Sequence, residues 1–142
     1  MWHRVFSIVH DDRGQSFVEV GLMLPLVALL VLGGLDLGRA YASQLAVQNA
    51  ARAGAEAKVL GGSCSSGPGN CPAVVTELSR VPGLHPVESA CPPAVEQFCV
   101  TVTSDSTFVT VTVQYTFQTL FDWRVVPHTA ALDRSTKLRT YQ

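Results

Sequence analysis

The chain has 142 residues, which is enough for one domain, or for one domain with a membrane anchor. Its 10 basic and 11 acidic residues give a formal net charge of -1. This argues against a nucleic-acid-binding protein, because such domains are usually strongly basic. Only 15% of the residues are charged and 47% are hydrophobic, so the composition also excludes a chain that is disordered throughout.

The first predicted element is an apolar helix near the N-terminus. From 17 to 35 the chain carries no charge except that of Glu19. About 20 apolar residues span the hydrocarbon core of a bilayer, which is roughly 30 Å thick. A core helix of a soluble domain keeps a polar face, and this run has none, so we predict a transmembrane helix over about 17–35. A cleaved secretory signal is the alternative.

The helix is predicted to continue over 36–60, where the chain is rich in alanine and free of proline. Arg52 and Glu56 lie one turn apart in this amphipathic half and can pair. Larger apolar side chains recur in it at every fourth position: Leu37, Tyr41 and Leu45. We expect this half to form part of a core and to present that face to a sheet in this chain or to a neighbouring protein.

The remaining chain predicts a small β domain. Residues 72–81 suit a short helix, with proline at the start. Residues 95–103 and 107–119 alternate in polarity and are rich in valine and threonine, as in a β-hairpin, and 132–141 could add a third strand. The predicted fold class is therefore α+β: a long N-terminal transmembrane and amphipathic helix followed by a small antiparallel β-sheet domain.

Four cysteines follow the apolar helix, at Cys64, Cys71, Cys91 and Cys99. Their spacings of seven and eight residues differ from the short gaps of zinc knuckles. In an exported domain the oxidising surroundings favour disulfides. Of the three possible connectivities we favour the two local ones, Cys64–Cys71 and Cys91–Cys99. Free buried thiols are the alternative, and a zinc site is a further one.

A short motif precedes the apolar helix. Gly14 follows a basic residue, and Glu19 stands five positions after the glycine, at the start of the predicted membrane span. A carboxylate there is costly in lipid and calls for a partner, unless it lies at the interface and is simply tolerated. The arrangement resembles the site of prepilin peptidase, which cuts after the glycine. In that family the glutamate meets the new N-terminal amine, here that of Gln15, usually on a neighbouring subunit.

The likeness extends along the whole helix. Residues 13–54 resemble the TadE-like family, the pseudopilins of tight-adherence (Tad, Flp-type) pilus and secretion systems. The shared pieces are the RGQ and VE of residues 13–19, the LPL of 24–26, the DLGR of 36–39 and the AARAGA of 50–55. The valine and threonine run from Val109 to Tyr115 also fits the family pattern.

The resemblance implies a domain organisation and a function. Residues 1–14 would be a prepilin leader, 15–60 the helix, and 61–142 an exported, disulfide-containing β domain. The protein would sit in the bacterial cytoplasmic membrane as a single-pass protein, with its N-terminus in the cytoplasm and its C-terminal domain outside. Its implied partners are other pilins or pseudopilins of the Tad system, prepilin peptidase, the inner-membrane assembly platform and the lipid bilayer, with no nucleic acid. A minor pilin or pseudopilin of this kind takes part in filament assembly.

We find no set of residues in the sequence that is typical of a catalytic site. We therefore expect that the protein is not an enzyme and that it has no metal site or cofactor. His3 and His10 fall in the predicted leader, and we expect His85 and His128 to be solvated in loops. Asp36 and Arg39 are one turn apart and are expected to form ion pairs at the membrane edge, within the chain or between subunits. The alternative function is an unprocessed single-pass envelope protein whose exported domain binds a ligand or partner.

Overall fold

The computed structural model describes residues 12–82, 84, 86–120 and 127–140. The predicted leader over 1–14 lies almost wholly outside the described residues. The chain forms two compact units, residues 1–37 and 38–142. A single helix, α1 (Asp12–Val59), contributes to both units.

The first unit is the apolar part of α1. Its most apolar 18-residue window has a mean hydropathy of 2.3, and none of that window is buried. This helix is long and apolar enough to cross a membrane. Pro25 lies inside it, and the helix continues past this residue.

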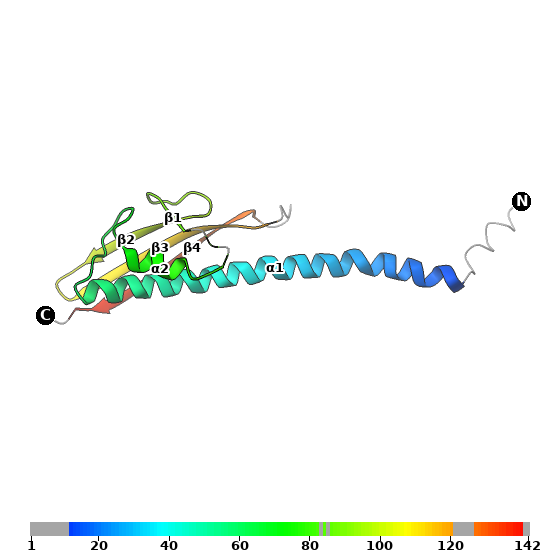
Figure 1. Cartoon of the computed structure of the whole chain (residues 1–142), viewed down its shortest axis with the longest axis horizontal. Coiled ribbons are helices and arrows are strands. Elements are labelled where there is room, and N and C mark those ends of the chain that lie inside the picture. The colour runs from blue at the N-terminus through cyan, green and yellow to red at the C-terminus, as the bar shows by residue number, and fades with distance from the viewer. Residues whose placement is uncertain (1–11, 83, 85, 121–126, 141–142) are drawn as a thin grey trace, which may run out of the picture. The chain divides into compact units, whose positions relative to one another are not determined.

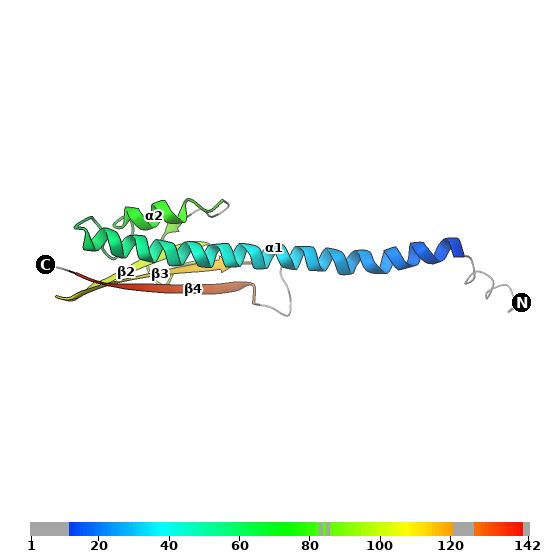
Figure 2. The same cartoon turned by 90° about the horizontal axis from the view of Figure 1, so that it is seen from below.

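The second unit combines the rest of α1 with a short helix and a sheet. Helix α2 (Pro72–Leu78) is followed by the strands β1 (Val87–Glu88), β2 (Gln97–Ser104), β3 (Phe108–Gln118) and β4 (Thr129–Arg139). The strands form one sheet in the order β1-β2-β3-β4. Figures 1 and 2 show α2 beside the second half of α1, with the sheet running along α1. The predicted α+β class, with a long helix followed by a small sheet, is confirmed.

The sheet differs from the prediction in being mixed rather than antiparallel. Strands β2, β3 and β4 are antiparallel neighbours, with Val100 opposite Val113 and Val113 opposite Arg134. Strand β1 instead pairs in parallel with β2, through Val87 and Glu88. The chain between them turns back so that both strands run in the same direction. A two-residue strand has no alternation, so it leaves no periodic signal in the sequence.

The core lies between one face of the sheet and α1. The alternation over 107–119 places five larger side chains on one face of β3, and all of them are buried: Val109, Val111, Val113, Tyr115 and Phe117. The helix covers them with small residues, chiefly Ala46, Val47, Ala50, Ala51 and Ala55. Val74 and Leu78 of α2 complete the same cluster. Small side chains allow the helix backbone to approach the sheet closely.

The structure excludes one of the two alternatives predicted for the larger apolar side chains of α1, namely packing on this chain's own sheet. Tyr41 is 64% exposed and Leu45 is 42% exposed, so the larger apolar side chains do not cover this chain's own sheet. Leu37, in the first unit, is exposed as well. The buried face of α1 consists of alanines instead, so the backbone of the helix can lie close to that of the sheet. The valines of the sheet fill the space between them. The predicted ion pair on the solvent side is confirmed, with Arg52 Nε 2.8 Å from Glu56 Oε1.

Candidate functional site

The residues predicted for cleavage, Gly14 and Gln15, and one predicted assembly residue, Glu19, lie at the start of α1. The helix begins at Asp12, so the bond between Gly14 and Gln15 falls in its first turn, although the side chains of 12–15 lie outside the described residues. Glu19 is exposed, and it is surrounded along the helix by exposed apolar side chains such as Phe17 and Val20. The structure thus presents a carboxylate on an otherwise apolar, uncovered helix.

The other two predicted assembly residues differ in burial. Asp36 is only 6% exposed, while Arg39 is half-buried. The guanidinium carbon of Arg39 lies 5.5 Å from the centre of the Phe117 ring, which is a cation–π contact. An ion pair between Asp36 and Arg39 stays a prediction.

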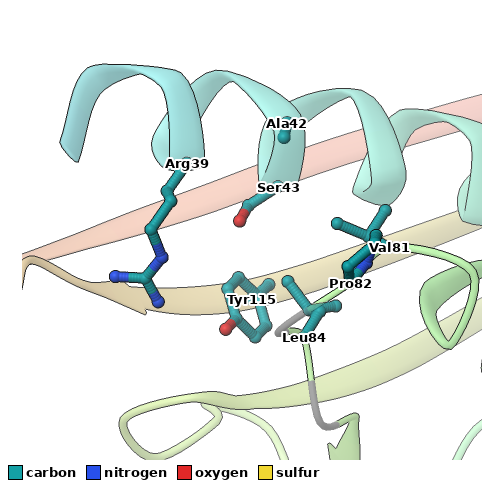
Figure 3. A pocket seen from close by; sticks show the side chains of 7 residues that line it. All are labelled: Arg39, Ala42, Ser43, Val81, Pro82, Leu84 and Tyr115. Atoms are coloured by element: carbon teal, nitrogen blue, oxygen red, sulfur yellow. The ribbon is translucent and has the colours of Figure 1, made fainter. Parts of the chain in front are cut away.

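Arg39 also lines a small pocket in the second unit. The cavity has a volume of about 40 Å³ and is bounded by α1, by β3 and by the segment after α2. Its lining residues are Arg39, Ala42, Ser43, Val81, Pro82, Leu84 and Tyr115. Figure 3 shows the side chains of Arg39 and Ser43 extending from α1 toward Tyr115. Sequence analysis missed Ser43 and Tyr115 as site residues, because they are polar members of runs that otherwise build the core.

The polar groups of this pocket are poorly solvated. Burial raises the pKa of Tyr115, the Glu96 carboxylate raises it further, and the Arg39 guanidinium acts in the opposite direction. The Tyr115 hydroxyl therefore stays protonated at neutral pH and can donate a hydrogen bond. Atom Nη1 of Arg39 is buried, and no hydrogen-bond partner for it occurs in the part of the chain that the structure describes. The pocket can therefore offer hydrogen-bond donors to a small acceptor.

The cysteines pair locally. Cys64 bonds to Cys71, and Cys91 bonds to Cys99, so the described cysteines include no free thiol. These are the two pairings that the sequence favoured. Cys64, Cys71 and Cys99 are buried. The first disulfide fastens the loop after α1 to the start of α2, and the second fastens the loop after β1 to β2.

Breaking the Cys91–Cys99 bond should destabilise the second unit. We expect the Cys91→Ala/Cys99→Ala variant to lose about 2–3 kcal/mol of unfolding free energy, because the open chain of this short loop gains conformational entropy. Urea unfolding of the purified chain in detergent measures the loss. Native wild-type protein should bind no maleimide until reductant is added. Four labelled thiols in the native protein would contradict the disulfide assignment.

The histidine at the β3–β4 connection is not simply solvated. Its ring nitrogens lie 2.7 Å from Gln118 Nε2 and 3.0 Å from Thr119 Oγ1. His128 is therefore a bonded part of the strand end, which corrects the expectation of a solvated loop residue. His3, His10 and His85 lie outside the described residues. No group of three His, Cys, Asp or Glu side chains that could hold a metal occurs in the described part of the chain.

The comparisons with known proteins bear on the helix alone. The family model described as TadE-like protein matches residues 14–56. Searches of curated proteins and of solved structures found no match. The matched stretch begins at the predicted cleavage glycine and ends at Glu56, in the part of α1 that packs on the sheet. The resemblance recognised from the sequence is confirmed over residues 14–56, which are similar to the TadE-like family, and this similarity is consistent with a protein of Tad pili.

Proposed function

We propose that this protein is a minor pilin or pseudopilin that takes part in assembling a Tad-type pilus or secretion filament. It is cleaved by prepilin peptidase after Gly14 and remains in the membrane through the apolar part of α1. The observation that carries the proposal is the family match over 14–56, because it includes the glycine, Glu19 and the apolar run together. The proposed role is structural and involves no catalysis.

The geometry of α1 supports this role. Its apolar window is uncovered by the rest of the described chain, so these side chains need lipid or the helix of another subunit. Glu19 is exposed within that surface. A carboxylate at the centre of a bilayer costs about 2.5–3.5 kcal/mol even by the lower scales, and an opposite charge reduces the cost of one that lies within the span. Cleavage before Gln15 would create such a charge, the new N-terminal ammonium.

The proposed location follows from the same helix. The protein spans the cytoplasmic membrane once, with its N-terminus inside and its disulfide-bonded domain in the oxidising space outside. Its proposed partners are other Tad pilins or pseudopilins, the prepilin peptidase and the inner-membrane assembly platform. Leu37, Tyr41 and Leu45 are exposed on α1 and are available to such a partner.

Replacing Gly14 tests the cleavage. We expect Gly14→Val to leave the full-length form in the membrane when the peptidase is co-expressed. The proposed cleavage follows a glycine, and the larger valine side chain at this position should prevent the peptidase from cutting the bond. Gly21→Val is the matched control, since nothing lies within 4 Å of a Cβ added there, and it should be cleaved normally. Gel mobility and N-terminal sequencing measure both.

Two results would contradict the proposal. A mature N-terminus after Ala40 or Ala42 would identify an ordinary secretory signal. A wild-type chain that keeps residues 1–14 in the presence of the peptidase would instead favour the unprocessed single-pass envelope protein.

A further inference from the structure

One hydrogen-bond donor in the pocket, atom Nη1 of Arg39, has no acceptor among the described residues. This atom is buried, and the described contact of the guanidinium is with the face of the Phe117 ring. A ring face attracts the positive charge but does not replace an oxygen acceptor in the plane of the guanidinium. Buried polar atoms are normally hydrogen-bonded, so this N–H group is available to an acceptor that enters the pocket.

Two further donors lie in the same pocket. The Tyr115 side chain is buried, and its raised pKa keeps the hydroxyl protonated. Ser43 is also buried and contributes a second hydroxyl from the next turn of α1. Figure 3 shows the three side chains converging from two elements. Several donors around a guanidinium form a suitable site for an anionic oxygen ligand.

The size of the pocket limits that ligand. A volume of about 40 Å³ is far below the roughly 300 Å³ or more of an ordinary small-molecule site. The pocket can take one or two oxygens of a small group whose remaining atoms stay outside. The guanidinium fork matches the geometry of phosphate, which it can bind through two parallel hydrogen bonds.

The position of Arg39 in α1 indicates where such a group would come from. Arg39 is four residues beyond Leu35, the last residue of the uncharged run, and this corresponds to about 6 Å along a helix. The headgroup layer begins where the hydrocarbon core ends. Once the apolar part of α1 is in a bilayer, Arg39 reaches the depth of the lipid phosphates.

We propose that the Arg39 pocket is a binding site for a phosphate group of the kind carried by a phospholipid headgroup. Arg39 pairs with the phosphate oxygens, and Tyr115 and Ser43 donate to them. The pocket then holds one lipid headgroup. This proposal requires membrane insertion of α1 but does not depend on cleavage or on a role in a filament.

Native mass spectrometry of the full chain in detergent tests the proposal. The protein is titrated with phosphatidylglycerol and, separately, with a galactolipid that has the same acyl chains and no phosphate. We expect the wild type to retain one phosphatidylglycerol at concentrations where the galactolipid is not retained. Arg39→Ala should weaken this retention about tenfold, and Tyr115→Phe about threefold, because each removes donors to the phosphate.

Arg52→Ala is the matched control. Arg52 lies on the same helix and carries the same charge, but it is exposed and paired with Glu56, so its loss should leave lipid retention unchanged. Equal retention by wild type, Arg39→Ala and Arg52→Ala would overturn the proposal, as would equal binding of the two lipids. If Arg39→Ala fails to fold, wild-type retention by both Arg39→Lys and Tyr115→Phe would overturn it.

Inorganic phosphate distinguishes the source of the ligand. We expect phosphate at millimolar concentration to compete weakly with the lipid, because it lacks acyl chains that keep it near the site. Tight binding of inorganic phosphate alone, abolished in Arg39→Ala, would support the phosphate chemistry and overturn the headgroup as its source.

Discussion

We expect the Glu19→Ala variant to enter the membrane and to be cleaved after Gly14, yet to be incorporated into assemblies about tenfold less than the wild type. The carboxylate is exposed on an apolar helix, where an ammonium group is its most favourable partner. Losing even about 1.4 kcal/mol at each subunit contact reduces the equilibrium constant for that contact tenfold. Quantitative blotting of sheared filaments or of cross-linked membrane complexes measures incorporation.

Glu56→Ala is the control for that experiment. Glu56 is also an exposed carboxylate of α1, but its described partner is Arg52 in a surface ion pair, which contributes little to stability. Its removal should leave incorporation within about twofold of the wild type. Normal assembly by Glu19→Ala would show that the carboxylate is merely tolerated at the interface, and would remove it from the proposed contact.

The Gly54→Val variant should lose about 2–3 kcal/mol of unfolding free energy in the second unit, because the core has no space for a side chain there. A Cβ built on Gly54 would lie 2.8 Å from Val74 Cγ2 and 3.2 Å from Val111 Cγ1. It would also lie 3.4 Å from Cys71 Sγ, which is held in a disulfide. All three neighbours are buried, so relief requires a shift of the helix itself. Urea unfolding in detergent, followed by tyrosine fluorescence, reports the change.

Gly38→Val provides the matched comparison on the same helix. Nothing lies within 4 Å of a Cβ added at Gly38, and valine is a slightly better helix former than glycine. We expect this variant to change the unfolding free energy by less than about 0.5 kcal/mol. If the two variants unfolded alike, close approach at Gly54 would not be what holds α1 against the sheet and α2.

The helices and strands of this protein could be predicted where polar and apolar residues recur regularly or where a long run lacks charge. The alternation of Val109 to Phe117 placed the buried face of β3 correctly, and the absence of charge placed the apolar part of α1. The sequence left the larger apolar face of the second half of α1 open between a sheet of this chain and a neighbouring protein, because side-chain size alone does not show which face is buried. Leu45 and Tyr41 face outward, whereas the alanines that look neutral in sequence meet the valines of the sheet.

The pocket was beyond prediction for a different reason. Arg39 was expected to form an ion pair at the membrane edge, but Tyr115 stands far along the chain, in the middle of an alternating strand. Only the pairing of β3 with its neighbours and the packing of α1 bring that hydroxyl to the arginine. His128 was misread likewise, because its partners Gln118 and Thr119 become adjacent only when β4 returns beside β3.

The alanine face of α1 has a consequence for biogenesis. Synthesis delivers the chain in order, so α1 is made before β3, which begins only at Phe108. During that interval the packing face of α1 is without its sheet. A face of leucines would then expose a large apolar surface, and the incomplete chain would be prone to aggregate. A face of alanines exposes far less apolar area, and alanine still favours a helix. Such a face can remain in contact with water until the valines of β3 have been made.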